Sequence, residues 1–355
     1  MKITKAVSAI MFVSLMAVLL HSVTGIEPLY IFGGLVAASV VMPHVEGAIM
    51  AGLIVEIWQN DILNNLFKGN EFANRCKNRD SDVIAGGVVH TQNAGAAVAV
   101  KKNITSFPQT VTERVDTTGT YEIDTYYALP RRIANLDKYE LSYDKRQSVV
   151  GEDMRKLTQE AMDGLLYRWA PTAASNVIVT TGASSADDTI IGTTGTRKLF
   201  TKLEYQKAIK KIKNTDNPGK ITALLTTNHY YQLLDSFSEG EKTAFHNVVD
   251  LAEGAIGRYY GADVIMRSTV DRYRKVAGIW TPLDTSADSG YVVGAGDSSA
   301  SLIYVEESVE RAVGAIDVFD NQGRAEFYGD IFSAMLRFGG RIRRPNGVYA
   351  IVEDI

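Results

Sequence analysis

The chain has 355 residues, of which 46% are hydrophobic and 22% are charged, and its formal net charge is −4. This composition excludes a wholly disordered chain, a collagen-like repeat and a protein that crosses a membrane many times. The balance of 37 basic and 41 acidic residues argues against a protein that wraps duplex nucleic acid by charge alone. A single cysteine, Cys76, excludes an intramolecular disulfide framework and a thiolate zinc cluster.

The N-terminal stretch is apolar and differs from the remainder of the chain. No charged residue occurs from Ala6 to Ile26, a run about long enough to span a bilayer or to form the apolar part of a signal peptide. Three explanations for residues 1–49 stay open: an extension of the gene model upstream of a true start at Met50, a leader that is removed, and a membrane anchor or short membrane protein fused to the remainder of the chain. We favour the start at Met50, because the chain from there on has an ordinary globular pattern.

The first elements after Met50 are predicted to be a helix, a polar turn-rich run and a hairpin. Apolar residues recur at helical spacing over Leu53–Lys68, and the polar run covers Gly69–Asp82. Apolar and polar residues alternate with period two over Thr120–Tyr126, which predicts a strand with one solvent-exposed face. The polar residues Lys101–Asn103 suit the exposed tip of the hairpin. Because a long two-stranded excursion cannot bury its own faces, we expect it to lie on another surface.

The strongest helical pattern covers Asp144–Trp169, which at 1.5 Å per residue is a rod of roughly 39 Å. An α/β region is predicted next. Its expected elements are a helix opened by a capping box at Thr201 and Glu204, with Leu203 among the inward residues, and a buried strand Ile221–Leu225. They continue with a helix capped by Asn228, a helical stretch around Ala244–Ala252, a strand ending at Met266, and mainly strands over Ser301–Ile355.

Motifs that would indicate an enzyme are largely missing. The chain has no nucleophile elbow, no phosphate loop and no zinc-protease helix, and Gly294-Ala295-Gly296 lacks the third glycine of a dinucleotide fingerprint. The acidic runs Asp80–Asp82 and Asp187–Asp188 are too small for a committed cation site and are interpreted as solvated turns. His229, His246 and Cys76 lack the partners of a catalytic site. We predict no enzyme, no catalytic residue, no cofactor and no metal.

Basic residues gather at a few places. The lysines between Lys207 and Lys213 lie opposite the apolar side of their helix, so a solvated face explains them. The remaining clusters are candidates for contacts between subunits, because arginine pairs with carboxylates at interfaces. These candidates are Lys101, Lys102, Arg131, Arg132, Arg341, Arg343 and Arg344.

The order of these elements resembles the major capsid protein of a tailed bacteriophage. The resemblance covers about residues 50–355 and rests on an arm with a tryptophan-bearing helix, a long hairpin, a long helix ending Leu165-Leu166-Tyr167-Arg168-Trp169, an α/β region and a closing strand unit. It implies an α+β fold of the Hong Kong 97 type. The implied parts are an N-terminal arm (50–82), an extended loop over a neighbouring subunit (83–129), a peripheral domain with a spine helix (130–172 and 311–355) and an axial domain (173–310).

The resemblance implies a structural subunit that assembles into pentamers and hexamers and forms the icosahedral shell around viral DNA, without sequence-specific binding of that DNA. The partners would be other copies of the chain and portal, scaffold and decoration proteins. The chain would be part of the virion and assemble in the host cytoplasm, with membrane contact only if residues 1–49 are retained. Some family members cross-link a loop lysine to a distant asparagine, but we favour plain salt bridges for Lys101 and Lys102.

Two other functions stay open. An encapsulin-like shell of the same fold would enclose an enzyme instead of DNA. An exported, membrane-tethered binding or hydrolytic protein would use residues 1–26 as its signal.

Overall fold

The structure of the chain is a computed structural model. The residues that it describes are 59, 62, 66, 70–84, 87–93, 100, 102–105, 107–108, 111, 113–134, 145–186, 190, 193–215, 219–246 and 256–355. All of them belong to one compact unit, Trp58–Ile355. The apolar stretch 1–49 and the cluster Asp187–Asp188 lie outside the described residues, as do most of the predicted helix Leu53–Lys68 and the residues of the Ala244–Ala252 stretch after His246. Among the described helices, none has both the length and the apolar character needed to cross a bilayer.

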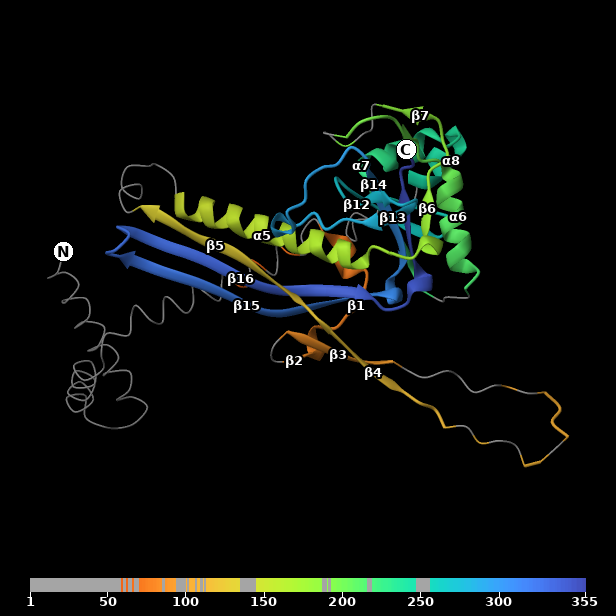
Figure 1. Cartoon of the computed structure of the whole chain (residues 1–355), viewed down its shortest axis with the longest axis horizontal. Coiled ribbons are helices and arrows are strands. Elements are labelled where there is room, and N and C mark those ends of the chain that lie inside the picture. Colours follow the sequence, from red (N-terminus) through yellow and green to blue (C-terminus); the bar gives the residue numbers. More distant parts are fainter. Residues whose placement is uncertain are drawn as a thin grey trace, which may run out of the picture. The chain divides into compact units, whose positions relative to one another are not determined.

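The long helix predicted from Asp144 is confirmed as α5 (Lys145–Trp169), which packs against a four-stranded sheet (Figure 1). One face of the helix is buried, as its apolar spacing predicted. The strand order is β1 (Lys77–Asn78), β15 (Val309–Arg324), β16 (Gly329–Ile342) and β5 (Asp124–Ala134). In β16, alternate side chains from Phe332 to Phe338 are buried, which is the period expected of a strand with one covered face.

An eight-stranded mixed sheet forms the second part of the core. The path β10–β11–β9–β14–β17–β6 runs from one edge to the other, and β12 and β13 branch from the first half of β14. The predicted buried strand is confirmed as β9, in which every residue is buried. The bounds are β6 (Val177–Val179), β9 (Ile221–Thr226), β10 (Gly257–Tyr259), β11 (Ala262–Arg267), β12 (Asp271–Val276), β13 (Ile279–Pro282), β14 (Asp297–Val305) and β17 (Val348–Val352).

Three helices, α6 (Lys202–Lys213), α7 (Thr227–Asp235) and α8 (Glu239–His246), share a hydrophobic cluster with this sheet. The predicted capping box at Thr201 and Glu204 is present at the start of α6. The expectation that Leu203 faces inward is wrong, because its side chain is 55% exposed and the buried Glu204 and Tyr205 follow it. The cap of α7 is also corrected: Thr226, not Asn228, accepts the hydrogen bond from the backbone N–H of His229.

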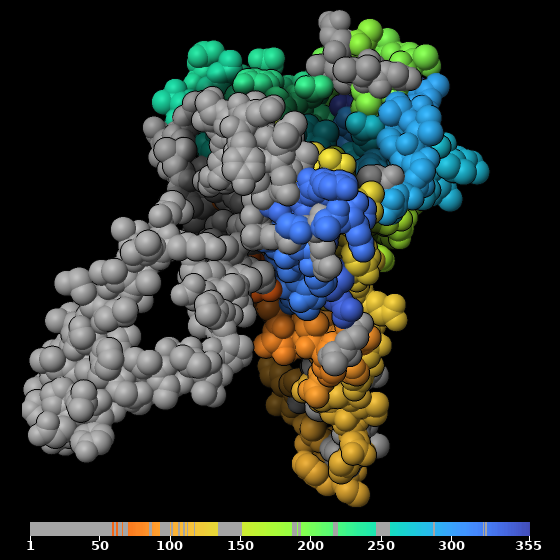
Figure 2. Space-filling model, turned by 90° about the vertical axis from the view of Figure 1, so that its left-hand side faces the viewer, coloured from red at the N-terminus to blue at the C-terminus, as the bar shows by residue number. Residues whose placement is uncertain are grey.

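The predicted hairpin is confirmed as β3 (Val88–Asn93) paired antiparallel with β4 (Thr117–Glu122), and β2 (Val83–Ile84) adds a third strand. A separate pair is formed by β7 (Ser184–Ser185) and β8 (Arg197–Lys198). Beyond the paired part of the hairpin, the described apolar side chains are uncovered. Their exposed fractions are 96% for Val100, 80% for Phe107, 95% for Val111 and 74% for Val115, while Ile104 is 39% exposed. In Figure 2 the gold atoms of this region extend away from the blue atoms of β15 and β16.

The domain boundaries drawn from the sequence stay predictions. Two described strands cross them: β5 begins at Asp124, within the predicted extended loop, and β15 begins at Val309, within the predicted axial domain. In addition, β17 lies in the range 311–355 predicted for the peripheral domain but pairs in the eight-stranded sheet. The long strands connect the two sheets directly, since the chain passes from β14 to β15 through the short 3-10 turn Glu306–Ser308.

Candidate functional site

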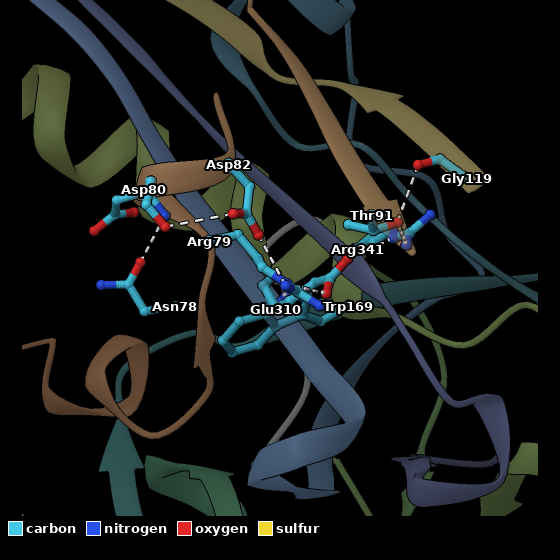
Figure 3. Close-up of polar contacts among 10 residues, drawn as sticks. Asn78, Arg79, Asp80, Asp82, Thr91, Gly119, Trp169, Glu310 and Arg341 are labelled. Carbon is cyan, nitrogen blue, oxygen red and sulfur yellow. Dashed lines mark hydrogen bonds and ion pairs between the residues drawn. The ribbon is translucent and has the colours of Figure 1, made fainter. Parts of the chain in front are cut away.

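Distant parts of the described chain meet around one buried carboxylate, that of Glu310 at the start of β15 (Figure 3). The side chain of Glu310 has no exposed area. Its Oε1 accepts a hydrogen bond from Nε of Arg341 at 2.6 Å, and its Oε2 accepts one from Nε of Arg79 at 3.2 Å. A buried carboxylate is costly unless it is paired and hydrogen-bonded, so these two guanidinium groups are what allow Glu310 to lie here.

Arg341 of β16 connects this carboxylate to the base of the hairpin. Its Nη2 donates to the hydroxyl of Thr91, and that hydroxyl donates to the backbone oxygen of Gly119 at 3.1 Å. Thr91 and Gly119 are opposite residues in the pairing of β3 with β4. The guanidinium also lies 4.8 Å from the centre of the Tyr121 ring, in cation–π geometry. One side chain therefore contacts both strands of the hairpin.

Arg79 connects the same carboxylate to the polar run that precedes the hairpin. Its Nη1 lies 2.8 Å from Oδ2 of Asp82, and its backbone N–H donates to the oxygen of Arg311. Asp80 accepts a hydrogen bond from the backbone N–H of Val313 at 2.7 Å and lies 3.4 Å from a guanidinium nitrogen of Arg311. The acidic run Asp80–Asp82, interpreted from the sequence as a solvated turn, thus attaches this segment to β15.

The C-terminal end of α5 also contacts the Glu310 site, through Trp169. Nε1 of Trp169 donates to the backbone oxygen of Glu310 at 3.1 Å, and its ring packs edge-on against Phe72 and tilted against Tyr304. β16 passes this point at Gly340, where an added Cβ would overlap the backbone oxygen of Glu310 and lie 3.1 Å from Nε1 of Trp169. A glycine is therefore needed at position 340 by close approach, and not by an unusual backbone angle.

The link between the hairpin and β5 is fixed at Ile123. Its backbone N–H donates to the oxygen of Gly87 at 2.9 Å, and its buried side chain packs with Val89 and Ala312. The next residue, Asp124, receives a two-pronged contact from Arg168 of α5, with the nearest atoms 2.8 Å apart. Ion pairs and packing therefore hold the hairpin root on both sides of the strand junction.

The predicted contact residues fall into different environments. Lys101 lies outside the described residues, whereas Lys102, Arg132 and Arg344 are exposed and Arg343 is half-exposed. Arg131 lies 3.0 Å from Asp153 of α5, and Arg341 is engaged inside the subunit as described above. Among the candidates that the structure describes, Arg341 is the one that lies at the Glu310 site. A role of these residues between subunits stays a prediction.

Sequence reasoning missed the surroundings of His229. Its Nδ1 lies 2.6 Å from Oγ of Ser301, and its Nε2 lies 3.1 Å from Oε1 of Glu353 without the alignment of a hydrogen bond. The three residues resemble a hydrolase triad in composition, but each is buried, so a substrate could not reach the serine hydroxyl. The histidine is a core residue, which is the interpretation that the sequence favoured. No local signal could have found these partners.

The other weak motifs have structural roles. Burial raises the pKa of the Cys76 thiol to about 12, so it stays a thiol at physiological pH. The backbone N–H of Gly294 donates to the carboxylate of Asp297, which is also bound by Arg274 and Tyr291. Within the part of the chain that the structure describes, no group of three or more His, Cys, Asp or Glu residues could hold a metal ion.

The fold can be compared with known proteins. No protein-family model and no curated protein matches the chain. Solved structures do match. The capsid of Ralstonia phage GP4 is 12% identical, with 79% of this chain and 87% of the phage chain covered and a TM-score of 0.54. The capsid structure of the Cyanophage P-SCSP1u is 14% identical, covering 78% and 86%, with a TM-score of 0.52. The head structure of Helicobacter pylori bacteriophage KHP40 is 12% identical, covering 78% and 89%, with a TM-score of 0.52.

These likenesses extend over most of both chains in each pair, although the sequences have diverged almost completely. The chain therefore has the α+β fold of phage capsid subunits, and the expectation of a Hong Kong 97-type fold is confirmed.

Proposed function

We propose that this chain is a structural subunit of an icosahedral bacteriophage head, and not an enzyme. It assembles into pentamers and hexamers that close into the shell around the viral DNA. One observation carries the proposal: in a chain with the capsid fold, the base of a hairpin is bound to the body, while apolar side chains described in its outer part are exposed.

The outer part of the hairpin needs a surface from outside its own subunit. Val100, Phe107, Val111 and Val115 are each at least 74% exposed. Full burial of one such side chain is worth about 1.5–3 kcal/mol. A neighbouring copy that covers them gains this energy at every equivalent contact, which is how many modest contacts close a symmetric shell.

The Glu310 site gives the hairpin a defined direction. Arg341 ties both hairpin strands to β16, and Ile123 and Asp124 tie the far side of the root to the body. A hairpin with a fixed root loses less conformational freedom when it meets its neighbour, so more of the contact energy is available for assembly.

The exposed basic residues are proposed to set the register of these contacts. Lys101 and Lys102 near the hairpin tip, Arg132 on β5, and Arg343 and Arg344 after β16 face acidic groups of neighbouring copies. Charged pairs at the rim of an interface contribute little to its affinity but select the correct orientation. The assembled particle is the virion, built in the host cytoplasm together with portal, scaffold and decoration proteins.

The experiment is to express the full chain and the chain from Met50, and to examine both by size-exclusion chromatography and negative-stain microscopy. We expect closed particles that are on the order of tens of nanometres across. A folded chain that stays monomeric under every assembly condition would refute the proposal. N-terminal sequencing of native particles then decides among Met1, Thr24 or Gly25, and Met50 as the first residue.

A further inference from the structure

A groove beside one edge of the eight-stranded sheet takes no part in the Glu310 site or in the hairpin. It lies between β6 and α6, which are neighbours in Figure 1, and has a volume of about 420 Å³. One wall is the apolar strand β6, and the other is a face of α6 that carries lysines. The lining residues are Val177, Ile178, Val179, Thr181, Lys207, Lys210, Lys211 and Asn214.

The strand in this groove has an open edge. Among the described strands, β6 pairs with β17 alone. The backbone N–H of Thr180 donates to the oxygen of Val352 in β17 at 3.0 Å, and the N–H groups of a strand point alternately to its two sides. The N–H of Val179 therefore points away from β17. An extended peptide can pair with such an edge and become a further strand.

The two faces of the sheet differ at this edge. Ile178 is buried in the cluster that α6 shares with the sheet, whereas Val177 and Val179 are half-buried on the opposite face. A residue of an added strand that lies opposite Ile178 shares its face and points towards α6. Residues opposite the two valines point to the other face and can cover them. An added strand therefore needs apolar side chains at alternate positions.

The positions that point towards α6 meet positive charge. Lys207, Lys210 and Lys211 are spaced i, i+3 and i+4, so they lie on one face of α6. Lys211 donates to the backbone oxygen of Ser175 and lies over the Tyr349 ring. Lys207 and Lys210 are exposed and have no ion-pair or hydrogen-bond partner among the described residues. One helical turn rises about 5.4 Å and two strand residues about 6.6 Å, so acids two positions apart match neighbouring lysines.

We propose that this groove binds an extended acidic peptide of a partner protein, which adds to β6 as a strand with acidic and apolar residues in alternation. The acidic side chains pair with Lys207 and Lys210, and the apolar side chains cover Val177 and Val179. The alternation distinguishes this ligand from nucleic acid, which offers negative charge without apolar side chains. The inference goes beyond the proposed function, because the groove belongs to the single chain whether or not a shell forms.

The direct test follows the fluorescence anisotropy of a labelled peptide, Val-Glu-Val-Glu-Val-Glu, as the full chain is added. Binding is expected. A peptide of the same composition in blocks, Val-Val-Val-Glu-Glu-Glu, should bind about tenfold more weakly, because its acids point to both faces of an added strand. The two peptides carry the same charge, so their difference reports strand addition and not attraction to lysines in general.

Variants of the chain test each wall of the groove. Lys207→Gln together with Lys210→Gln should weaken binding of the alternating peptide about fivefold or more, by loss of two ion pairs. Lys220→Gln changes an exposed lysine outside the groove and should leave the affinity unchanged. Val179→Pro removes the N–H that points away from β17, so it should abolish binding while the chain keeps its circular dichroism spectrum. The lysine variants leave the strand intact and keep the test decisive where the proline variant does not fold.

Three results would overturn the inference: no binding of the alternating peptide, equal binding of the block peptide, and equal binding to the variant without Lys207 and Lys210. A duplex DNA oligonucleotide serves as competitor. Displacement of the peptide by DNA at the same concentration of negative charge would show a surface for polyanions in general and would also overturn it. Particle formation is scored separately, since a chain that binds the peptide but forms no shell would refute the proposed function and support the groove.

Discussion

The replacement Arg341→Met is the sharpest test of the hairpin root. Methionine keeps much of the length of the side chain but removes its charge and donors. The change leaves the fully buried Glu310 with Arg79 alone, and it deletes the contacts to Thr91 and the Tyr121 ring.

The expected cost can be worked from these contacts. Removing one partner of a buried ion pair typically costs about 3–5 kcal/mol, and the lower end applies because Arg79 still neutralises part of the charge of Glu310. A cation–π contact at a partly exposed site contributes about 0.5–1 kcal/mol. Methionine recovers some packing, so we expect the free energy of unfolding to fall by about 3 kcal/mol.

The assay combines urea unfolding with hydrogen exchange of the backbone amides. Exchange should accelerate most at the strands that hold Thr91 and Gly119, because these lose their connection to β16, and much less in the eight-stranded sheet. Arg343→Met is the matched control: this arginine follows the same strand, is half-exposed and should change stability by less than about 0.5 kcal/mol. A loss below about 1 kcal/mol for Arg341→Met, or uniform acceleration of exchange, would refute the reasoning.

Three further predictions concern stability and assembly. Burial raises the pKa of Asp271 to about 7, so the folded chain favours the neutral carboxyl group. The resulting contribution to the free energy of unfolding is fully present below about pH 4 and is lost as the pH rises towards 7. Asp271→Asn should therefore leave stability unchanged at pH 4 and raise it by on the order of 2 kcal/mol at pH 8, as followed by thermal unfolding; a gain equal at both pH values would contradict the cause. Gly340→Ala should cost about 2–4 kcal/mol by overlap with Glu310, whereas Gly151→Ala, in open space on α5, should stabilise by about 0.5–1 kcal/mol; equal effects in urea unfolding would disprove the steric argument. Replacing residues 94–116 by a short turn should keep the folded core but prevent particle formation in negative stain, and normal particles would exclude the hairpin from assembly.

Local patterns in the sequence predicted the elements that are stabilised locally. The apolar spacing of α5, the capping box of α6 and the continuous apolar run of β9 each need only neighbours within a few residues, and all three are confirmed. The errors are equally local. The spacing predicts an inward Leu203, whose side chain is exposed, and Asn228 fits the rule for a cap, but Thr226 fills that position. In both cases a nearby residue satisfies the same rule.

The sequence by itself also predicted the type of fold, because the order of the elements survives where residue identity does not. Only the tertiary structure decided which groups Arg341 and Arg79 bind within the subunit. The predicted contact of Arg341 with a neighbouring subunit stays a prediction. The guanidinium of Arg341 binds Glu310, and Arg79 reaches the same carboxylate from 231 residues earlier in the chain. Pairing at that separation leaves no periodic signal. It exists because a carboxylate enclosed by α5, β15 and β16 must be neutralised by whichever guanidinium groups the fold brings within hydrogen-bonding distance.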